Sequence, residues 1–182
     1  MAARQGSMDC LCGVYAVLNA TELVVGRRLF NHKPKNKRSH KRALFAELIH
    51  FLAKKNKLKR AMTAGIVNID ARGGLIDVAI KSVQKRQLLT MMKQVAFEDD
   101  CQTLDAYLDK LHQHLLEANT AVIINITGRL EHWTCIKEIT QDWLVLADSA
   151  GIKQLNRHQC NIGIEEKGIY SLWPSKTYLL SL

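Results

Sequence analysis

The chain has 182 residues, of which 47% are hydrophobic and 24% are charged, and its formal net charge is +9. This length fits one domain with a substantial core, and the composition is normal for a soluble globular protein. No apolar run approaches the roughly 20 residues of a membrane-spanning helix, and the longest good candidate is the short 121–126 stretch. The first residues lack a secretory-signal pattern, so we expect a cytoplasmic protein or one exported by another route.

Basic residues are concentrated in one segment. Residues 27–60 contain 13 Lys or Arg and a single acidic residue, Glu47, whereas the rest of the chain contains 13 basic and 16 acidic residues. Such a segment could contact phosphates or an acidic partner surface. The alternative interpretation is a solvated loop and helix face without a partner.

Helices are predicted for the first half of the chain. Asp9 is a suitable N-cap for a buried helix from about Leu11 to Val25, which Gly26 ends. Residues 28–39, rich in Lys and Arg and containing Pro34, are predicted to form an irregular loop. The spacing of apolar residues predicts further helices over 40–55, 75–84 and 104–117.

Strands are predicted for the second half. Residues 121–127, 133–139, 143–147 and 170–182 are rich in Val, Ile, Thr, Trp and Tyr, which suit strands. We therefore expect an α+β fold in a single domain spanning 1–182. Its helical lobe is expected to cover about 1–118, and its lobe of antiparallel sheet about 119–182.

Cys12 is a candidate nucleophile. It is expected in the first turn of the helix that follows Asp9, where exposed N–H groups and the helix dipole stabilise a thiolate. Gln5, on the preceding loop, could donate its side-chain N–H to the oxyanion of a tetrahedral intermediate, together with the backbone N–H of Cys12. Cys10 is a rival nucleophile, since it directly follows Asp9.

His132 and Asp148 are candidate partners of that thiol. They lie 16 residues apart across an expected hairpin whose turn is at 140–142. If the pairing is symmetric about position 140, the two residues face each other with their Cβ atoms about 5 Å apart. The carboxylate would then engage one imidazole nitrogen and leave the other for a thiol.

The segments from Cys12 to Asn19, at His132-Trp133 and at Ala147-Asp148 resemble the papain-like cysteine peptidase superfamily. Within it they look closest to bacterial double-glycine (bacteriocin-processing) peptidases. The resemblance implies a papain-like fold, in which a helical lobe with the nucleophile helix packs on a C-terminal antiparallel sheet. It also implies roles for four residues: Gln5 in the oxyanion hole, Cys12 as nucleophile, His132 as general base and then acid, and Asp148 as the residue that orients His132.

The remaining cysteines are interpreted as core packing, namely Cys101, Cys135 and Cys160. A structural zinc site is not expected, because Cys10 and Cys12 are separated by one residue and have no second close Cys or His pair. No phosphate-binding glycine loop is found either. We therefore expect no cofactor and no metal.

The leading hypothesis is thiol-dependent hydrolysis of an amide in a peptide or protein substrate. A glutamine deamidase or transglutaminase-type effector with the same triad is the first alternative, because the chemistry is identical up to the acyl-enzyme. Small bacterial members of the superfamily resemble effectors or toxins, which would be delivered into a target cell. The second alternative is a non-catalytic protein that binds nucleic acid or an acidic partner, such as an inhibitor protein, through residues 27–60; nucleic acid is the less favoured of these partners.

Overall fold

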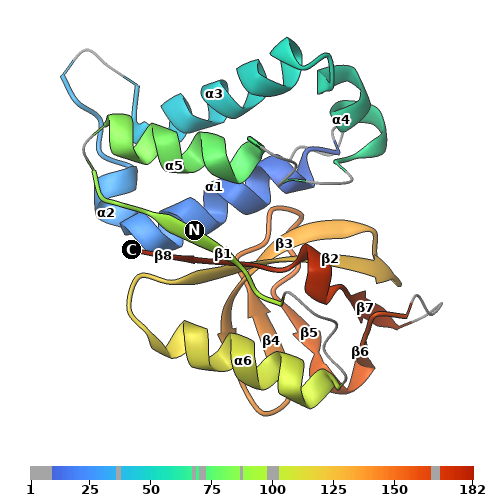
Figure 1. Ribbon diagram of the computed structural model, residues 1–182. Helices are drawn as coiled ribbons and strands as arrows, with labels where there is room; N and C mark the ends of the chain where they lie inside the picture. Colours follow the sequence, from blue (N-terminus) through green and yellow to red (C-terminus); the bar gives the residue numbers. More distant parts are fainter. Residues whose placement is uncertain are drawn as a thin grey trace.

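The computed structural model describes residues 10–35, 38–66, 69, 73–86, 88–97, 103–164 and 169–182. They form an α+β fold with an open, mostly antiparallel sheet (Figure 1). The helices are α1 (Cys12–Val25), α2 (Arg27–Phe30), α3 (His40–Lys54), α4 (Leu58–Ala64), α5 (Leu75–Lys85) and α6 (Leu104–Leu116), with short 3-10 helices η1 (Arg157–Gln159) and η2 (Pro174–Lys176). The strands are β1 (Met92–Val95), β2 (Ala121–Gly128), β3 (His132–Ile139), β4 (Trp143–Leu146), β5 (Gln154–Asn156), β6 (Cys160–Ile162), β7 (Tyr170–Leu172) and β8 (Tyr178–Ser181).

The sheet has the strand order β1-β8-β2-β3-β4-β5, and β7 extends it by pairing with the end of β2. All these pairs are antiparallel, whereas β6 and β7 pair in parallel. Strand β8, which comes last in the chain, lies between β1 and β2. The sheet is therefore completed by the last strand of the chain.

Both faces of the sheet are covered by helices, with α1, α3 and α5 on one side and α6 on the other (Figure 1). The alternation of side chains along β2 explains this, because successive residues of a strand point to opposite faces. Ala121 and Ile123 belong to the core shared with α1, while Val122, Ile124 and Ile126 belong to the core shared with α6.

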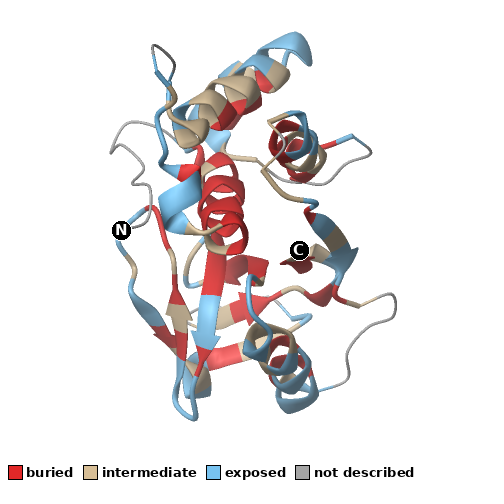
Figure 2. Ribbon diagram, turned by 90° about the vertical axis from the view of Figure 1, so that its left-hand side faces the viewer, coloured by how far each residue is buried: buried red, intermediate tan, exposed pale blue. Residues whose placement is uncertain are grey.

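Helix α1 is buried along most of its length and packs between β2 and β3 on one side and α3 and α5 on the other (Figure 2). Close packing near its start requires a glycine. A Cβ at Gly13 would lie 2.7 Å from Cγ2 of Ile69 and 3.3 Å from Cβ of Ile66. Gly13 thus allows Ile66 and Ile69 to approach the first turn of α1 closely.

Most of the helices and strands predicted from the sequence are confirmed, but four observed elements were not predicted, namely α4, β1, β5 and β6, and three expectations need correction. A short helix, α2, follows Gly26 directly, so the loop begins later than expected. The predicted strand 170–182 is divided into β7 and β8, because Pro174 lacks an N–H and opens η2. The third correction concerns the expected boundary between the lobes near residue 118, because two elements before it belong with the sheet. Strand β1 pairs with β8, and α6 packs on the sheet through Tyr107, Leu108 and Leu111.

Within the described residues, no helix combines the length and apolar character that crossing a bilayer requires.

Candidate active site

Cys12 is the first residue of α1. The N-cap residue is Leu11, whose side chain forms no capping hydrogen bond. Asp9 itself and Gln5, the expected oxyanion-hole residue, lie outside the described residues. The structure therefore places the Cys12 sulfur at a helix N-terminus, as the sequence predicts.

The hairpin of β3 and β4 brings His132 to Asp148 by a different register from the predicted one. The turn spans four residues, since Ile139 pairs with Leu144, which places the register three residues from the predicted one. An irregularity between Ile136 and Glu138 then moves the register back by one residue. The N–H of Ala147 donates to the carbonyl of Cys135 at 2.8 Å. This contact brings Asp148 opposite Thr134 rather than His132, so His132 reaches Asp148 diagonally.

Asp148 nevertheless binds His132 closely. The His132 Nε2 and Asp148 Oδ1 atoms are 2.5 Å apart, and the Thr134 hydroxyl donates to the same oxygen at 2.8 Å. The other carboxylate oxygen accepts the backbone N–H groups of Ala150 at 2.7 Å and Ile152 at 3.1 Å. The Asp-Ser-Ala-Gly turn thus orients the carboxylate, whose side chain is fully buried.

His132 and Asp148 each stabilise the charged form of the other. Burial by itself disfavours the charged form of His132, but hydrogen bonds to Asp148 and Cys12 raise its pKa to about 9. Burial also opposes ionisation of Asp148, yet the bonds from His132 and Thr134 hold the pKa of its carboxyl below the ordinary value. At neutral pH the site therefore contains an imidazolium and a carboxylate.

The four described cysteines are free thiols that fall into two groups with different environments. Burial raises the pKa of the Cys135 and Cys160 thiols to about 12, in agreement with core packing. Cys10 is exposed, while Cys12 is buried beside the imidazole. Because His132 engages Asp148 through Nε2, its Nδ1 is the ring nitrogen left for Cys12. Cys101 lies outside the described residues.

A cavity of about 150 Å³ opens beside the Cys12 sulfur and His132. Its wall includes the chain from Ala64 to Ile66, and the Trp133 indole N–H donates to the Ile66 carbonyl at 2.5 Å. Asn125 of β2 also lines this cavity. The arrangement provides space for a small substrate group next to the thiol. We refer to this space as the thiol pocket.

No protein-family model, curated protein or solved structure matches this chain. The geometry of the site is therefore the basis for inferring its function. In the part of the chain that the structure describes, no three His, Cys, Asp or Glu side chains gather closely enough to share a metal ion.

Two supporting residues were not predicted. Thr134 hydrogen-bonds to Asp148, and its place two residues after His132 on the same strand is a signal that could have identified it. Asn19, which is buried in α1, donates its Nδ2–H to the carbonyl of Ala147 at 3.0 Å. This bond joins the helix that carries Cys12 to the residue before Asp148.

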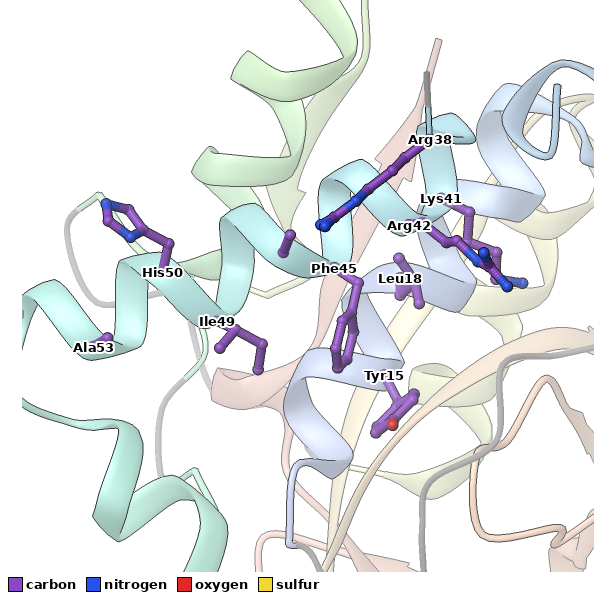
Figure 3. Close-up of a pocket in the computed structure, with 10 residues that line it drawn as sticks. Tyr15, Leu18, Arg38, Lys41, Arg42, Phe45, Ile49, His50 and Ala53 are labelled. Atoms are coloured by element: carbon purple, nitrogen blue, oxygen red, sulfur yellow. The ribbon is translucent and has the colours of Figure 1, made fainter. Parts of the chain in front are cut away.

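The basic segment forms a separate groove between α1 and α3, shown in Figure 3. Its apolar lining includes Tyr15, Leu18, Phe45 and Ile49. Arg38, Lys41 and Arg42 lie at one end. Lys41 is paired with Glu22, whereas neither arginine forms an ion pair with a described residue. We call this feature the basic groove.

Proposed function

We propose that this protein is a papain-like cysteine hydrolase that cleaves an amide bond of a peptide or protein. The observation that carries the proposal is a pair of hydrogen bonds that joins three side chains. One hydrogen bond is between Cys12 and His132, and the other is between His132 and Asp148. A cysteine at the start of a buried helix that packs on an antiparallel sheet, with a histidine opening one of its strands, also supports a papain-like fold.

In the proposed reaction the Cys12 thiolate attacks the substrate carbonyl carbon and forms a C–S bond. The His132 imidazolium gives its proton to the leaving amine as the C–N bond breaks. Water then attacks the thioester while His132 accepts its proton, and the acid product leaves as the C–S bond breaks. Asp148 holds the imidazole in orientation and stabilises its positive charge throughout.

The oxyanion of each tetrahedral intermediate would accept hydrogen bonds from the Cys12 backbone N–H and from Gln5, as the family resemblance implies. Proteolysis is the favoured net reaction. Deamidation of a glutamine side chain, or transfer of its acyl group to an amine, proceeds through the same acyl-enzyme and is the first alternative.

Alkylation by iodoacetamide, followed by mass mapping of every cysteine, tests the proposal. At pH 6–7 we expect Cys12 to react at least about tenfold faster than exposed Cys10, because Cys12 contacts the His132 imidazolium, and a positive charge beside a thiol favours its reactive thiolate. The Cys12→Ser variant should lose hydrolysis of a casein or peptide-library substrate, and Cys10→Ser should retain it. Equally slow labelling of all cysteines contradicts the proposal. Dominant labelling of Cys10 would identify Cys10, rather than Cys12, as the nucleophile.

A non-catalytic role in binding an acidic protein segment is a second candidate, and the basic groove is the observation that favours it. Phe45 and Ile49 lie on one side of α3 and face Tyr15 of α1, which provides an apolar floor (Figure 3). Arg38 and Arg42 at its end supply charge for carboxylates. An acidic peptide with an apolar anchor side chain matches both features.

Replacement of both arginines, Arg38→Glu and Arg42→Glu, is expected to weaken binding of an acidic peptide by up to about 30-fold, since each exposed pair contributes up to about 1 kcal/mol. Fluorescence anisotropy at 50 and 300 mM salt measures this loss and its salt dependence. Lys59→Glu together with Arg60→Glu, on exposed residues of α4, makes the same charge change away from the groove. Equal losses in both double variants, or tighter binding of an oligonucleotide, would contradict a specific acidic-peptide site.

A further inference from the structure

Asn125 has an unusual environment in the thiol pocket. Its side chain is only 7% exposed, and it points from β2 into the cavity that contains Cys12 and His132. Within the described residues, its Oδ1 atom has no hydrogen-bond partner. A buried polar atom without a partner destabilises the folded state, so such atoms in folded proteins call for an explanation.

The core offers no structural reason for an amide at this position. Ala121 and Ile123, which precede Asn125 on the same face of β2, are apolar and fully buried against α1. A leucine has nearly the shape of asparagine and would continue this apolar row without leaving an oxygen unpaired. The amide is therefore better explained by a group that enters the pocket.

The rest of the thiol pocket indicates the chemistry of that group. Its volume of about 150 Å³ is below the roughly 300–1,000 Å³ of sites for whole small molecules, so it fits one side chain or functional group. Glu131 and Lys176 bring one charge of each sign to its lining. The Thr127 hydroxyl already accepts the Trp173 indole N–H at 2.9 Å. A neutral group that both donates and accepts is the best match.

We propose that Asn125 recognises a primary carboxamide of the substrate, such as a glutamine or asparagine side chain, in the thiol pocket beside Cys12. A primary carboxamide presents its carbonyl oxygen and one N–H side by side, as Asn125 does, so the two amides form two hydrogen bonds with each other. A trans peptide group presents its N–H and C=O on opposite sides and makes only one. The terminal torsion of asparagine is broad, which lets Oδ1 turn toward the ligand at small cost.

This inference rests on the proposed function, because it assigns the substrate class of the same site. It also bears on the first alternative, since a carboxamide bound next to the thiol is the reacting group of a glutamine deamidase. In a peptidase it would instead be a side chain near the scissile bond.

Two small alkylating reagents of similar size test the proposal. Iodoacetamide carries a primary carboxamide, and methyl iodoacetate carries an ester, which has no N–H. The ratio of their rates at Cys12 is compared with the same ratio at exposed Cys10, which serves as the reference within each molecule. We expect the preference for the carboxamide to be about five- to tenfold larger at Cys12, as one net hydrogen bond provides about 1 kcal/mol.

The Asn125→Leu variant should lose this excess preference while its melting temperature stays equal or rises, because an unpaired buried oxygen is removed. Asn156→Leu on β5 is the matched control and should keep the preference. An equal ratio at Cys12 and Cys10 in a rapidly labelled wild-type protein overturns the inference and leaves the proposed function intact. A lower melting temperature of Asn125→Leu with an unchanged ratio also overturns it. Slow labelling of Cys12 by both reagents overturns the proposed function as well.

Discussion

Replacement of His132 by alanine is expected to slow alkylation of Cys12 by about 100-fold at pH 6, since an unassisted thiol of pKa about 8.5 is only about 0.3% thiolate at that pH. His132 has a pKa of about 9 and contacts Cys12, so it remains an imidazolium beside the sulfur across the neutral range. A positive charge at this place favours the thiolate. The rate of iodoacetamide labelling at pH 6, 7.5 and 9 measures the effect.

The difference between wild type and His132→Ala should narrow as the pH rises. Above about pH 9 the imidazole of the wild-type protein loses its proton, and an ordinary thiol is then largely ionised without help. His158→Ala, at a histidine that is mostly exposed and bonded only weakly to Asp142, is the matched control. If the labelling rate of Cys12 in the wild type rises with pH as steeply as in His132→Ala, Cys12 and His132 do not form a thiolate–imidazolium pair.

Replacement of Asp148 by alanine is expected to lower the free energy of unfolding by about 3–5 kcal/mol at pH 7, the range for removing one partner of a buried ion pair. The variant loses the carboxylate that pairs with His132 and accepts from Thr134, Ala150 and Ile152. It leaves the imidazolium buried without its counter-charge. Urea unfolding of the wild type and the variant measures the loss.

The free energy of unfolding of the wild type is expected to fall as the pH rises. The folded-state pKa of His132 is about 9, above its ordinary value of 6.5, so its contribution is fully present below pH 6.5 and is lost as the pH rises through 9. The loss should be on the order of 3 kcal/mol in the wild type, at about 1.4 kcal/mol for each unit of pKa, and much smaller in Asp148→Ala. Asp142→Ala, at an exposed carboxylate, should keep the wild-type dependence. A wild-type stability that does not fall between pH 6.5 and 9.5 would contradict this account.

The parts of the fold that could be predicted depend on local patterns. Apolar spacing predicted α3, α5 and α6 to within two residues, because one face of each helix is buried. Strand β1 was missed, since it is mostly exposed and has no alternation of apolar and polar residues. Its position in the sheet follows from pairing with β8, which lies about 85 residues later and leaves no local signal.

Local patterns also made part of the candidate site predictable, namely the part that lies within one hairpin. His132 and Asp148 are joined by one hairpin, so their proximity could be inferred even though the register was wrong by two residues. The irregularity at Lys137, which moves the register back by one residue, has no recognisable signature in the sequence. Asn125 could not be singled out at all, because its significance arises from the unpaired Oδ1 atom and from the cavity it lines.

The position of β8 has a consequence for the order in which the site can form during folding. Cys12 precedes His132 and Asp148 by more than a hundred residues, and the sheet that supports the two later residues lacks a strand between β1 and β2 until β8 is in place. Contacts between residues far apart in the sequence form slowly, because a long loop must close first. We therefore expect the Cys12 thiol to acquire its imidazole partner only late in folding.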